Sequence, residues 1–208
     1  SGRAFSWHYP ERMRPFENRY TLVRNITREG HIANMQKAVS QICTNPSSMI
    51  VILDQDDYLM QDTVVERLLR ARAKGHDLIQ MPMFRPNKPL KLYQPDYNSP
   101  RQKGGGNTWA HMRAFTKELF DRIPVQHLKT ADDDWYRQVT DYATMLPMAE
   151  LARSPVYLDA GYAYWHERED YSATHKEQES AALKDILAKP ALEKEGTVEP
   201  LPACDESS

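Results

Sequence analysis

Short apolar runs alternate along the chain with longer segments in which apolar residues recur every three or four positions. The short runs predict strands at residues 20–23, 49–53, 77–84, 108–115, 156–158 and 161–166. The longer segments predict helices at residues 31–43, 63–74, 116–120, 141–152 and 176–189, the fourth with an interruption at Pro147. Strands interleaved with helices predict an α/β fold, with a central mixed sheet and helices on both faces.

The two ends of the chain depart from this pattern. Residues 1–19 mix aromatic, charged and proline residues without a clear period, and residues 190–208 are charged and poor in large apolar side chains. The length of 208 residues is ordinary for one domain with a substantial core. We therefore expect one domain over residues 1–189 and a loose polar tail over residues 190–208.

Composition narrows the classes of protein further. A hydrophobic fraction of 40% and a charged fraction of 27% are ordinary for a soluble globular protein. The net charge of -2 does not indicate a general polyanion binder, although a local basic groove leaves nucleic acid open as a partner. No apolar run approaches the roughly 18 residues of a membrane span, and the sequence starts without the apolar segment of a signal peptide. Cys43 and Cys204 are far apart in sequence, which predicts free thiols and a cytoplasmic location.

The first candidate site follows the apolar run 49–53, which is β-branched and predicts a short buried strand. The chain then meets Asp54, Asp56 and Asp57. Ligands of open α/β sheets bind outside the carboxyl ends of strands, and two acids at positions i and i+2 can hold one divalent cation through oxygen ligands. Such a cation offsets the charge of a bound diphosphate. The alternative is a solvated acidic turn that precedes the next helix, with Asp62 as its N-cap.

The second candidate is a glycine-rich segment at residues 101–107. Its three glycines allow the backbone to approach a ligand closely, and Arg101 and Lys103 have side chains suited to phosphate oxygens. The spacing differs from the glycine motifs of P-loop and dinucleotide-binding proteins. The alternative is a flexible hinge with solvated charges.

The third candidate is the run of three acids Asp132, Asp133 and Asp134, at the expected start of a helix that continues through residues 141–152. Thr130 or Asp132 is a suitable cap for that helix, but a cap explains one acid and not three. Neighbouring carboxylates raise each other's pKa, which suits a general base. A purely structural acidic cluster is the alternative.

These stretches resemble the GT-A-fold, family 2 glycosyltransferases. The segment 53–59 is similar to the metal-binding D-x-D segment of that family, and the resemblance extends over about residues 20–172. Three further stretches carry it: a loop with Asn25 and Gly30 before a helix; the end of the glycine-rich segment with the strand, short helix and Ile-Pro turn that follow it, over residues 106–124; and a closing strand from Tyr162. The resemblance implies a GT-A-like fold, a nucleotide-diphosphate sugar donor, Mn²⁺ or Mg²⁺, and an inverting sugar transfer.

The resemblance also implies roles for individual residues. Asp54 is expected at the donor ribose or the metal, and Asp56 and His166 at the metal, although a lone histidine is often structural. The family places a carboxylate pair at the start of a helix as the base, which here predicts Asp133 or Asp134. The remaining donor-binding residues are expected to be Arg101, Lys103, Gly105 and Gly106.

One departure from the family pattern leaves questions open. The family begins with two strands that help to hold the nucleotide base, and residues 1–19 contain neither, so either a segment is missing or this region works differently.

The acceptor stays open between a glycan, a lipid, a protein and a nucleic-acid base. Two other functions also stay open: a non-catalytic sugar- or nucleotide-binding module, and a nucleotidyltransferase that makes a nucleotide sugar.

Overall fold

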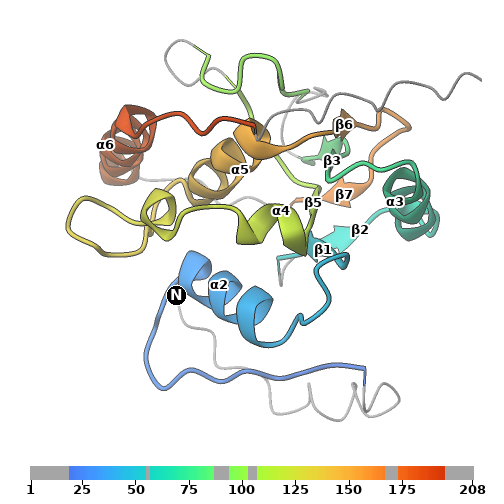
Figure 1. The fold of residues 1–208 in the computed structure, drawn as a ribbon, viewed down its shortest axis with the longest axis horizontal. Helices are drawn as coiled ribbons and strands as arrows, with labels where there is room; N and C mark the ends of the chain where they lie inside the picture. The colour runs from blue at the N-terminus through green and yellow to red at the C-terminus, as the bar shows by residue number, and fades with distance from the viewer. Residues whose placement is uncertain (1–18, 55–56, 87–93, 103–106, 167–172, 195–208) are drawn as a thin grey trace, which may run out of the picture.

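The computed structural model describes residues 19–54, 57–86, 94–102, 107–166 and 173–194, which contain two β-sheets and the helices that pack on them (Figure 1). The larger sheet has four strands in the order β1-β5-β3-β6. They are β1 (Met49–Ile52), β5 (Arg113–Thr116), β3 (Leu78–Gln80) and β6 (Pro155–Tyr157). β5 runs antiparallel to β1 and to β3, whereas β3 and β6 are parallel, so the sheet is mixed as predicted.

A smaller sheet has three strands in the order β2-β7-β4. They are β2 (Tyr58–Leu59), β7 (Tyr164–Trp165) and β4 (Met83–Phe84), and β7 runs antiparallel to β2 and parallel to β4. The helices are α2 (His31–Gln41), α3 (Val64–Ala73), α4 (Lys117–Asp121), the short 3-10 helix η2 (Val125–Leu128), α5 (Thr140–Leu151) and α6 (Ala173–Ala188).

The strands of the larger sheet contribute to two hydrophobic clusters, one on each face. Leu78 and Phe115 belong to the cluster that contains residues of α2, α4, α5 and α6, whereas Ile79 and Ala114 belong to the cluster that contains residues of α3. Successive side chains of a strand point to opposite faces, so this alternation places helices on both faces, as the sequence predicted. In Figure 1, α3 lies apart from the other helices, with the strands between them.

Helix α5 is the most deeply buried helix of the larger cluster, since every residue from Tyr142 to Leu151 is buried. The interruption expected at Pro147 is wrong, because the helix continues through this residue. A proline inside a helix costs about 3 kcal/mol, since it has no N–H to donate and its ring crowds the preceding turn. The packing of α5 on all sides offsets that cost.

Several of the predicted strands are shorter than expected, among them the run 161–166, of which only Tyr164–Trp165 forms β7. The run 77–84 is divided into β3 and β4, which lie in different sheets, and Pro82 lies between them without an N–H for a sheet hydrogen bond. The run 108–115 becomes a strand only at Arg113, so the preceding residues are free to line a cavity. Residues 20–23 form no strand within the described part of the chain.

The strand β1 lies at the edge of the larger sheet within the described residues, and Val51 is 37% exposed. The run 49–53 therefore forms a half-buried edge strand and not the buried strand that its composition predicted.

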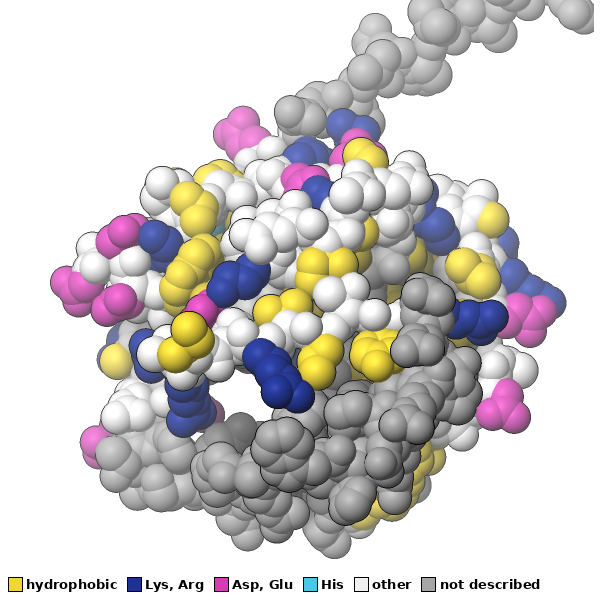
Figure 2. Space-filling view, turned by 90° about the horizontal axis from the view of Figure 1, so that it is seen from below, with side chains coloured by type: hydrophobic (Ala, Val, Ile, Leu, Met, Phe, Trp, Pro, Cys, Tyr) yellow, Lys and Arg dark blue, Asp and Glu magenta, His cyan; other side chains and the backbone are white. Residues whose placement is uncertain are grey.

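Figure 2 shows hydrophobic side chains on the surface seen from below, between lysine and arginine side chains. Among the described residues, no helix is both long and apolar enough to cross a membrane.

Candidate functional site

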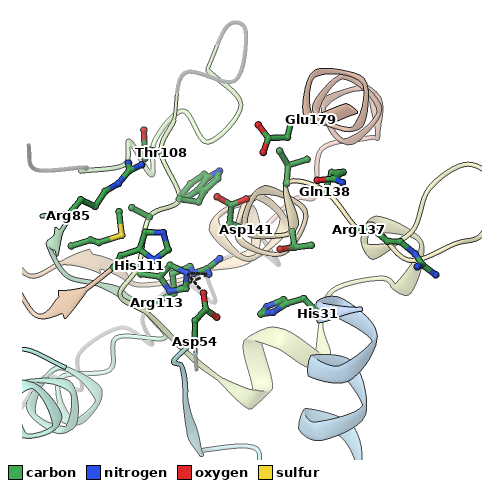
Figure 3. Close-up of a pocket in the computed structure, with 16 residues that line it drawn as sticks. His31, Asp54, Arg85, Thr108, His111, Arg113, Arg137, Gln138, Asp141 and Glu179 are labelled. Atoms are coloured by element: carbon green, nitrogen blue, oxygen red, sulfur yellow. Dashed lines mark hydrogen bonds and ion pairs between the residues drawn. The ribbon is translucent and has the colours of Figure 1, made fainter. Parts of the chain in front are cut away.

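A pocket of about 410 Å³ lies where β1, β4 and β7 end and where β5, α2 and α5 begin (Figure 3). The strands β1 and β5 are antiparallel, so the end of one and the start of the other lie at the same edge of the sheet. Chemistry-bearing side chains gather here from residues distant in sequence. Those that line the pocket are His31, Asp54, Arg85, His111, Arg113, Arg137, Asp141, His166 and Glu179.

Asp54 lies on one side of the pocket, against His111 and Arg113. The Nε2 atom of His111 lies 3.3 Å from Oδ2 of Asp54, and Nη2 of Arg113 lies 2.5 Å from the same ring nitrogen. The contact with His111 and the charge of Arg113 lower the pKa of Asp54 to about 2, against the opposing effect of burial. Burial, together with Arg113, lowers the pKa of His111. Asp54 is therefore a carboxylate at neutral pH.

Arg113 is a buried cation at the base of the pocket, with only 5% of its surface exposed. Burial lowers its pKa, whereas Asp141 and Asp54 raise it through their negative charges. A buried charge is tolerated only beside opposite charge or hydrogen-bonding partners. The two pocket carboxylates thus share one buried positive charge.

Asp141 and His31 line the pocket from the starts of two helices. Asp141 is in the first turn of α5 and is half-buried, at the helix end that favours negative charge. His31 is the first residue of α2, after Gly30, whose φ of 96° is a backbone conformation that glycine adopts readily. Burial and Arg113 lower the pKa of His31, whereas Asp54 and Asp141 raise it. Figure 3 shows both carboxylates and His31 around the same cavity.

His166 follows β7 and is held by Asp57, which precedes β2. Nδ1 of His166 lies 2.9 Å from Oδ2 of Asp57, whose side chain is 0% exposed. The hydroxyl of Tyr164 accepts a hydrogen bond of 3.1 Å from the backbone N–H of Asp54 and also contacts the Asp57 side chain. Burial is the main cause that raises the pKa of Tyr164. A carboxylate on one ring nitrogen fixes the orientation of the ring and leaves Nε2 for a ligand.

The residues around the pocket fit a divalent cation in part. Among the described residues, no group of three or more His, Cys, Asp or Glu side chains has a geometry that holds a metal ion. Asp54 and His166 line the pocket and provide oxygen and nitrogen donors of the kinds that Mn²⁺ accepts. Asp56, the other predicted ligand, lies outside the described residues, so its role stays a prediction.

The predicted donor-binding residues are likewise only partly among the described residues. Lys103, Gly105 and Gly106 lie outside the described residues. Arg101 is described, and it does not line the pocket. Its guanidinium forms an ion pair with Glu150 of α5, and Nη1 donates hydrogen bonds of 2.9 and 2.8 Å to the carbonyl oxygens of Leu187 and Lys189. These partners tie the segment before the glycines to α5 and to the end of α6.

The acidic run does not begin a helix, so that prediction is wrong. A β-bridge pairs Lys129 with Trp135, the acids lie in the turn between them, and α5 begins only at Thr140. The Asp133 side chain is 81% exposed and lies 2.9 Å from Nζ of Lys129. Neither Asp133 nor Asp134 lines the pocket. Their catalytic role stays a prediction, while the structure places another carboxylate at a helix start.

Several residues of the site carry no role in the sequence prediction, among them His111, Arg113 and Asp141 of the pocket lining and Asp57, which contacts His166. Asp141 was detectable, because Thr140-Asp141 immediately precedes the apolar run that forms α5. His111 and Arg113 lie in a stretch that reads as an ordinary strand. Asp57 is part of the D-x-D segment, but its contact with His166 joins residues 109 positions apart.

Comparisons with known proteins agree with this architecture. The chain matches the model of glycosyl transferase family 2 over residues 6–137. The structure of TarS residues 1–349 from S. aureus superposes with a TM-score of 0.54 at 12% identity, covering 88% of this chain and 59% of that chain. The TarS complex with UDP gives 0.53 at 13% identity, with 79% and 48% covered, and the complex with UDP-GlcNAc gives 0.50 at 12%, with 80% and 48% covered. No curated protein matches the sequence.

At these identities the likeness to TarS shows the fold alone, and this chain spans 59% or less of the TarS chains it matches. The predicted GT-A-like α/β fold is confirmed by that likeness and by the mixed sheet. The family match covers more than half of the residues. The chain therefore belongs to glycosyl transferase family 2.

Proposed function

We propose that this chain transfers a sugar from a uridine-diphosphate donor to an acceptor hydroxyl, with inversion at the anomeric carbon. The observation that carries the proposal is the pocket that brings Asp54, after a strand, and Asp141, at a helix start, to one cavity. The UDP and UDP-GlcNAc complexes of TarS, which shares the fold, support a uridine nucleotide as the donor.

Asp141 is the proposed general base. It lines the pocket, whereas Asp133 and Asp134 lie in an exposed turn, and a base must reach the proton that it removes. In the reaction the acceptor oxygen bonds to the anomeric carbon, the bond from that carbon to the diphosphate oxygen breaks, and the acceptor proton passes to Asp141. The electron pair of the broken bond leaves with UDP.

Asp54, Asp56 and His166 are the proposed ligands for the donor ribose and for Mn²⁺ or Mg²⁺. A divalent cation bound there offsets the negative charge that develops on the leaving diphosphate. Asp57 holds the His166 ring by its Nδ1 atom, so it positions that ligand without contacting substrate. Lys103, Gly105 and Gly106 remain proposed contacts of the diphosphate.

Two measurements test the proposal. Calorimetric titration with UDP in Mn²⁺ and in chelator should show that tight binding requires the cation, and equal affinity in both conditions would contradict the metal requirement. Incubation with UDP-GlcNAc and other UDP-sugars should release UDP slowly by hydrolysis even without an acceptor. A chain that binds UDP but never hydrolyses any UDP-sugar is a binding module, and a chain that consumes UTP and a sugar phosphate is a nucleotidyltransferase.

A further inference from the structure

A second cavity, of about 160 Å³, lies at the other end of β5 from the pocket that contains Asp54. Arg113 at the start of β5 lines that pocket, whereas Thr116 at the end of β5 lines the second cavity. The two spaces share no lining residue. We name the second one the arginine cavity, because it is lined by Arg72, Arg122 and Arg153.

The three arginines of the arginine cavity come from separate parts of the chain. Arg72 is in the last turn of α3, Arg122 follows α4, and Arg153 lies between α5 and β6. Arg72 and Arg122 are half-buried. Nη1 of Arg122 donates a hydrogen bond of 3.2 Å to the carbonyl oxygen of Leu151, which holds this side chain in place. Three cations thus converge on a small space, where negative charge is needed to offset their repulsion.

Two carboxylates also line the arginine cavity, and each has contacts of its own. The two oxygens of Asp77 accept hydrogen bonds of 2.8 and 2.9 Å from the backbone N–H groups of Arg153 and Ser154. The carboxylate of Glu118 lies 3.9 Å from Nη1 of Arg153, and the two side chains are 57% and 59% exposed, so this ion pair is weak. Three positive and two negative side chains line the cavity, which leaves one positive charge in excess.

A buried hydroxyl group provides a neutral donor in the same cavity. Thr116 is only 3% exposed, and its Oγ1 accepts a hydrogen bond of 3.2 Å from the backbone N–H of Leu119 as the N-cap of α4. Within the described part of the chain, the hydroxyl proton of Thr116 has no acceptor. Its O–H is therefore available to an oxygen atom inside the cavity.

We propose that the arginine cavity binds a phosphate group, an inference that does not rest on the proposed sugar transfer. Guanidinium groups donate paired, charge-assisted hydrogen bonds to phosphate oxygens. A tetrahedral phosphate has oxygens in several directions, which suits arginines from three elements, whereas the two oxygens of a carboxylate lie in one plane. The volume of about 160 Å³ is that of roughly five waters at about 30 Å³ each, so the cavity admits a phosphate group and not a whole nucleotide.

Isothermal titration of the full chain with inorganic phosphate, and separately with glycerol 3-phosphate, tests the proposal. Both titrations are made in chelator, so that no metal brings phosphate to the pocket that contains Asp54. The variant is Arg72→Gln, which removes the charge and keeps a good helix former. Arg70→Gln is the matched control, because Arg70 is in the same last turn of α3, has a side chain that is 73% exposed, and does not line the cavity. Arg137→Gln is the second control, because Arg137 lines the other pocket.

Arg72→Gln should bind phosphate roughly tenfold more weakly than the wild type, the effect of one lost charge-assisted hydrogen bond. Arg70→Gln and Arg137→Gln should bind as the wild type. Binding of both ligands through Arg72 supports recognition of free phosphate, and binding of glycerol 3-phosphate alone supports recognition of a phosphate monoester.

The proposal is overturned if neither ligand binds, if Arg72→Gln binds as tightly as the wild type, or if Arg137→Gln alone weakens binding, which would place the phosphate in the other pocket. Thermal unfolding without ligand checks that each variant is folded. UDP affinity, measured on the same samples, should be equal in Arg72→Gln and the wild type. Phosphate binding through Arg72 in a chain without UDP affinity would contradict the proposed donor and leave this site intact.

Discussion

Two groups of acidic side chains in this chain differ in what surrounds them. Asp54, Asp57 and Asp141 lie at the ends of core elements, where Asp54 contacts His111 and Asp57 contacts His166. The acids at 132–134 are adjacent in sequence, are all exposed, and lie in a turn between two bridged residues. Three consecutive acids are the more conspicuous pattern in the sequence, yet Asp54 and Asp141, which are far apart in sequence, are the ones that line one cavity.

The difference shows what makes a carboxylate useful for chemistry. An exposed carboxylate in a turn is solvated by water and screened by salt, so its charge has little effect at a distance. A carboxylate at the end of a strand or at the start of a helix is fixed by the core and faces other charges in a water-poor space. Each prediction below changes a residue of one group or a residue that supports it.

The largest expected effect is on turnover, in the Asp141→Asn variant. Loss of a general base lowers the rate by about a hundred- to ten-thousand-fold. Asp133→Asn and Asp134→Asn should keep most activity, because their positions are outside the pocket. The measurement is sugar transfer, or UDP-sugar hydrolysis until an acceptor is known, beside UDP affinity for each variant. Full turnover in Asp141→Asn with loss in either of the other two would return the base to the acidic turn.

The next effect is on stability, in the Arg101→Ala variant. Glu150 has a side chain that is only 5% exposed, so removing Arg101 leaves a buried carboxylate without its cation. Breaking a buried pair in this way costs about 3–5 kcal/mol of the free energy of unfolding. Arg70→Ala is the matched control, since its pair with Glu66 is exposed and should contribute about 1 kcal/mol or less.

Urea denaturation of the two variants measures this difference, and UDP titration separates it from the predicted donor contact. Normal stability with weakened UDP binding in Arg101→Ala would favour the role in donor binding that the glycine-rich segment suggested. Reduced stability with unchanged UDP affinity would assign Arg101 to the packing of α5 and α6.

The sequence is informative where a site depends on local order and much less so where it depends on distant contacts. The place of Asp54 directly after a strand could be predicted, because the apolar run before it is a local pattern that favours a strand. Arg101 beside glycines suggested a phosphate contact, since nothing nearby in the sequence indicates Glu150 as its partner. Asp57 and His166 meet only because β2 pairs with β7.

The helix start that was predicted at residues 132–134 shows the same limit of reasoning from local sequence. Residues 130–134 contain good caps and acids, which favour a helix start locally. The bridge between Lys129 and Trp135 and the buried Tyr136 instead keep this stretch as a turn. The helix then begins at Thr140, so the acid at its first turn is Asp141. Tertiary contacts therefore determine which of these acids lines the pocket.

A smaller effect is expected in the Asp57→Asn variant. Asparagine keeps the size of the side chain but removes the charge that holds Nδ1 of His166, so the ring loses its fixed orientation. Loss of such a partner typically costs about ten- to a hundred-fold in metal affinity. Mn²⁺ titration by electron paramagnetic resonance measures it, with the exposed Asp159→Asn as control. Unchanged Mn²⁺ affinity in Asp57→Asn would mean that His166 is not a metal ligand or needs no support.

The smallest effect is a dependence of stability on pH that arises from His31. Burial is the main cause that lowers the pKa of His31 in the folded chain, with Arg113 acting in the same direction. In the unfolded chain the ring takes up a proton near its ordinary pKa of about 6.5. At pH values between this unfolded pKa and the lower pKa of the folded chain, the unfolded chain binds more protons than the folded chain. The free energy of unfolding therefore falls as the pH falls.

Thermal unfolding at pH 8, 7, 6 and 5.5 measures this dependence. His31→Asn should flatten it in part, because burial also lowers the pKa of His111, which contributes a slope of the same sign. His127→Asn, outside the pocket, should retain the slope of the wild type. The pocket carboxylates oppose the lowering of the His31 pKa, because the negative charges of Asp54 and Asp141 favour the charged ring. Asp141→Asn should therefore make the loss of stability on acidification steeper, whereas Asp133→Asn in the exposed turn should leave the slope unchanged. Equal slopes in both Asp variants would mean that Asp141 does not act on His31, and the contrast between the two acidic groups would lose its electrostatic basis.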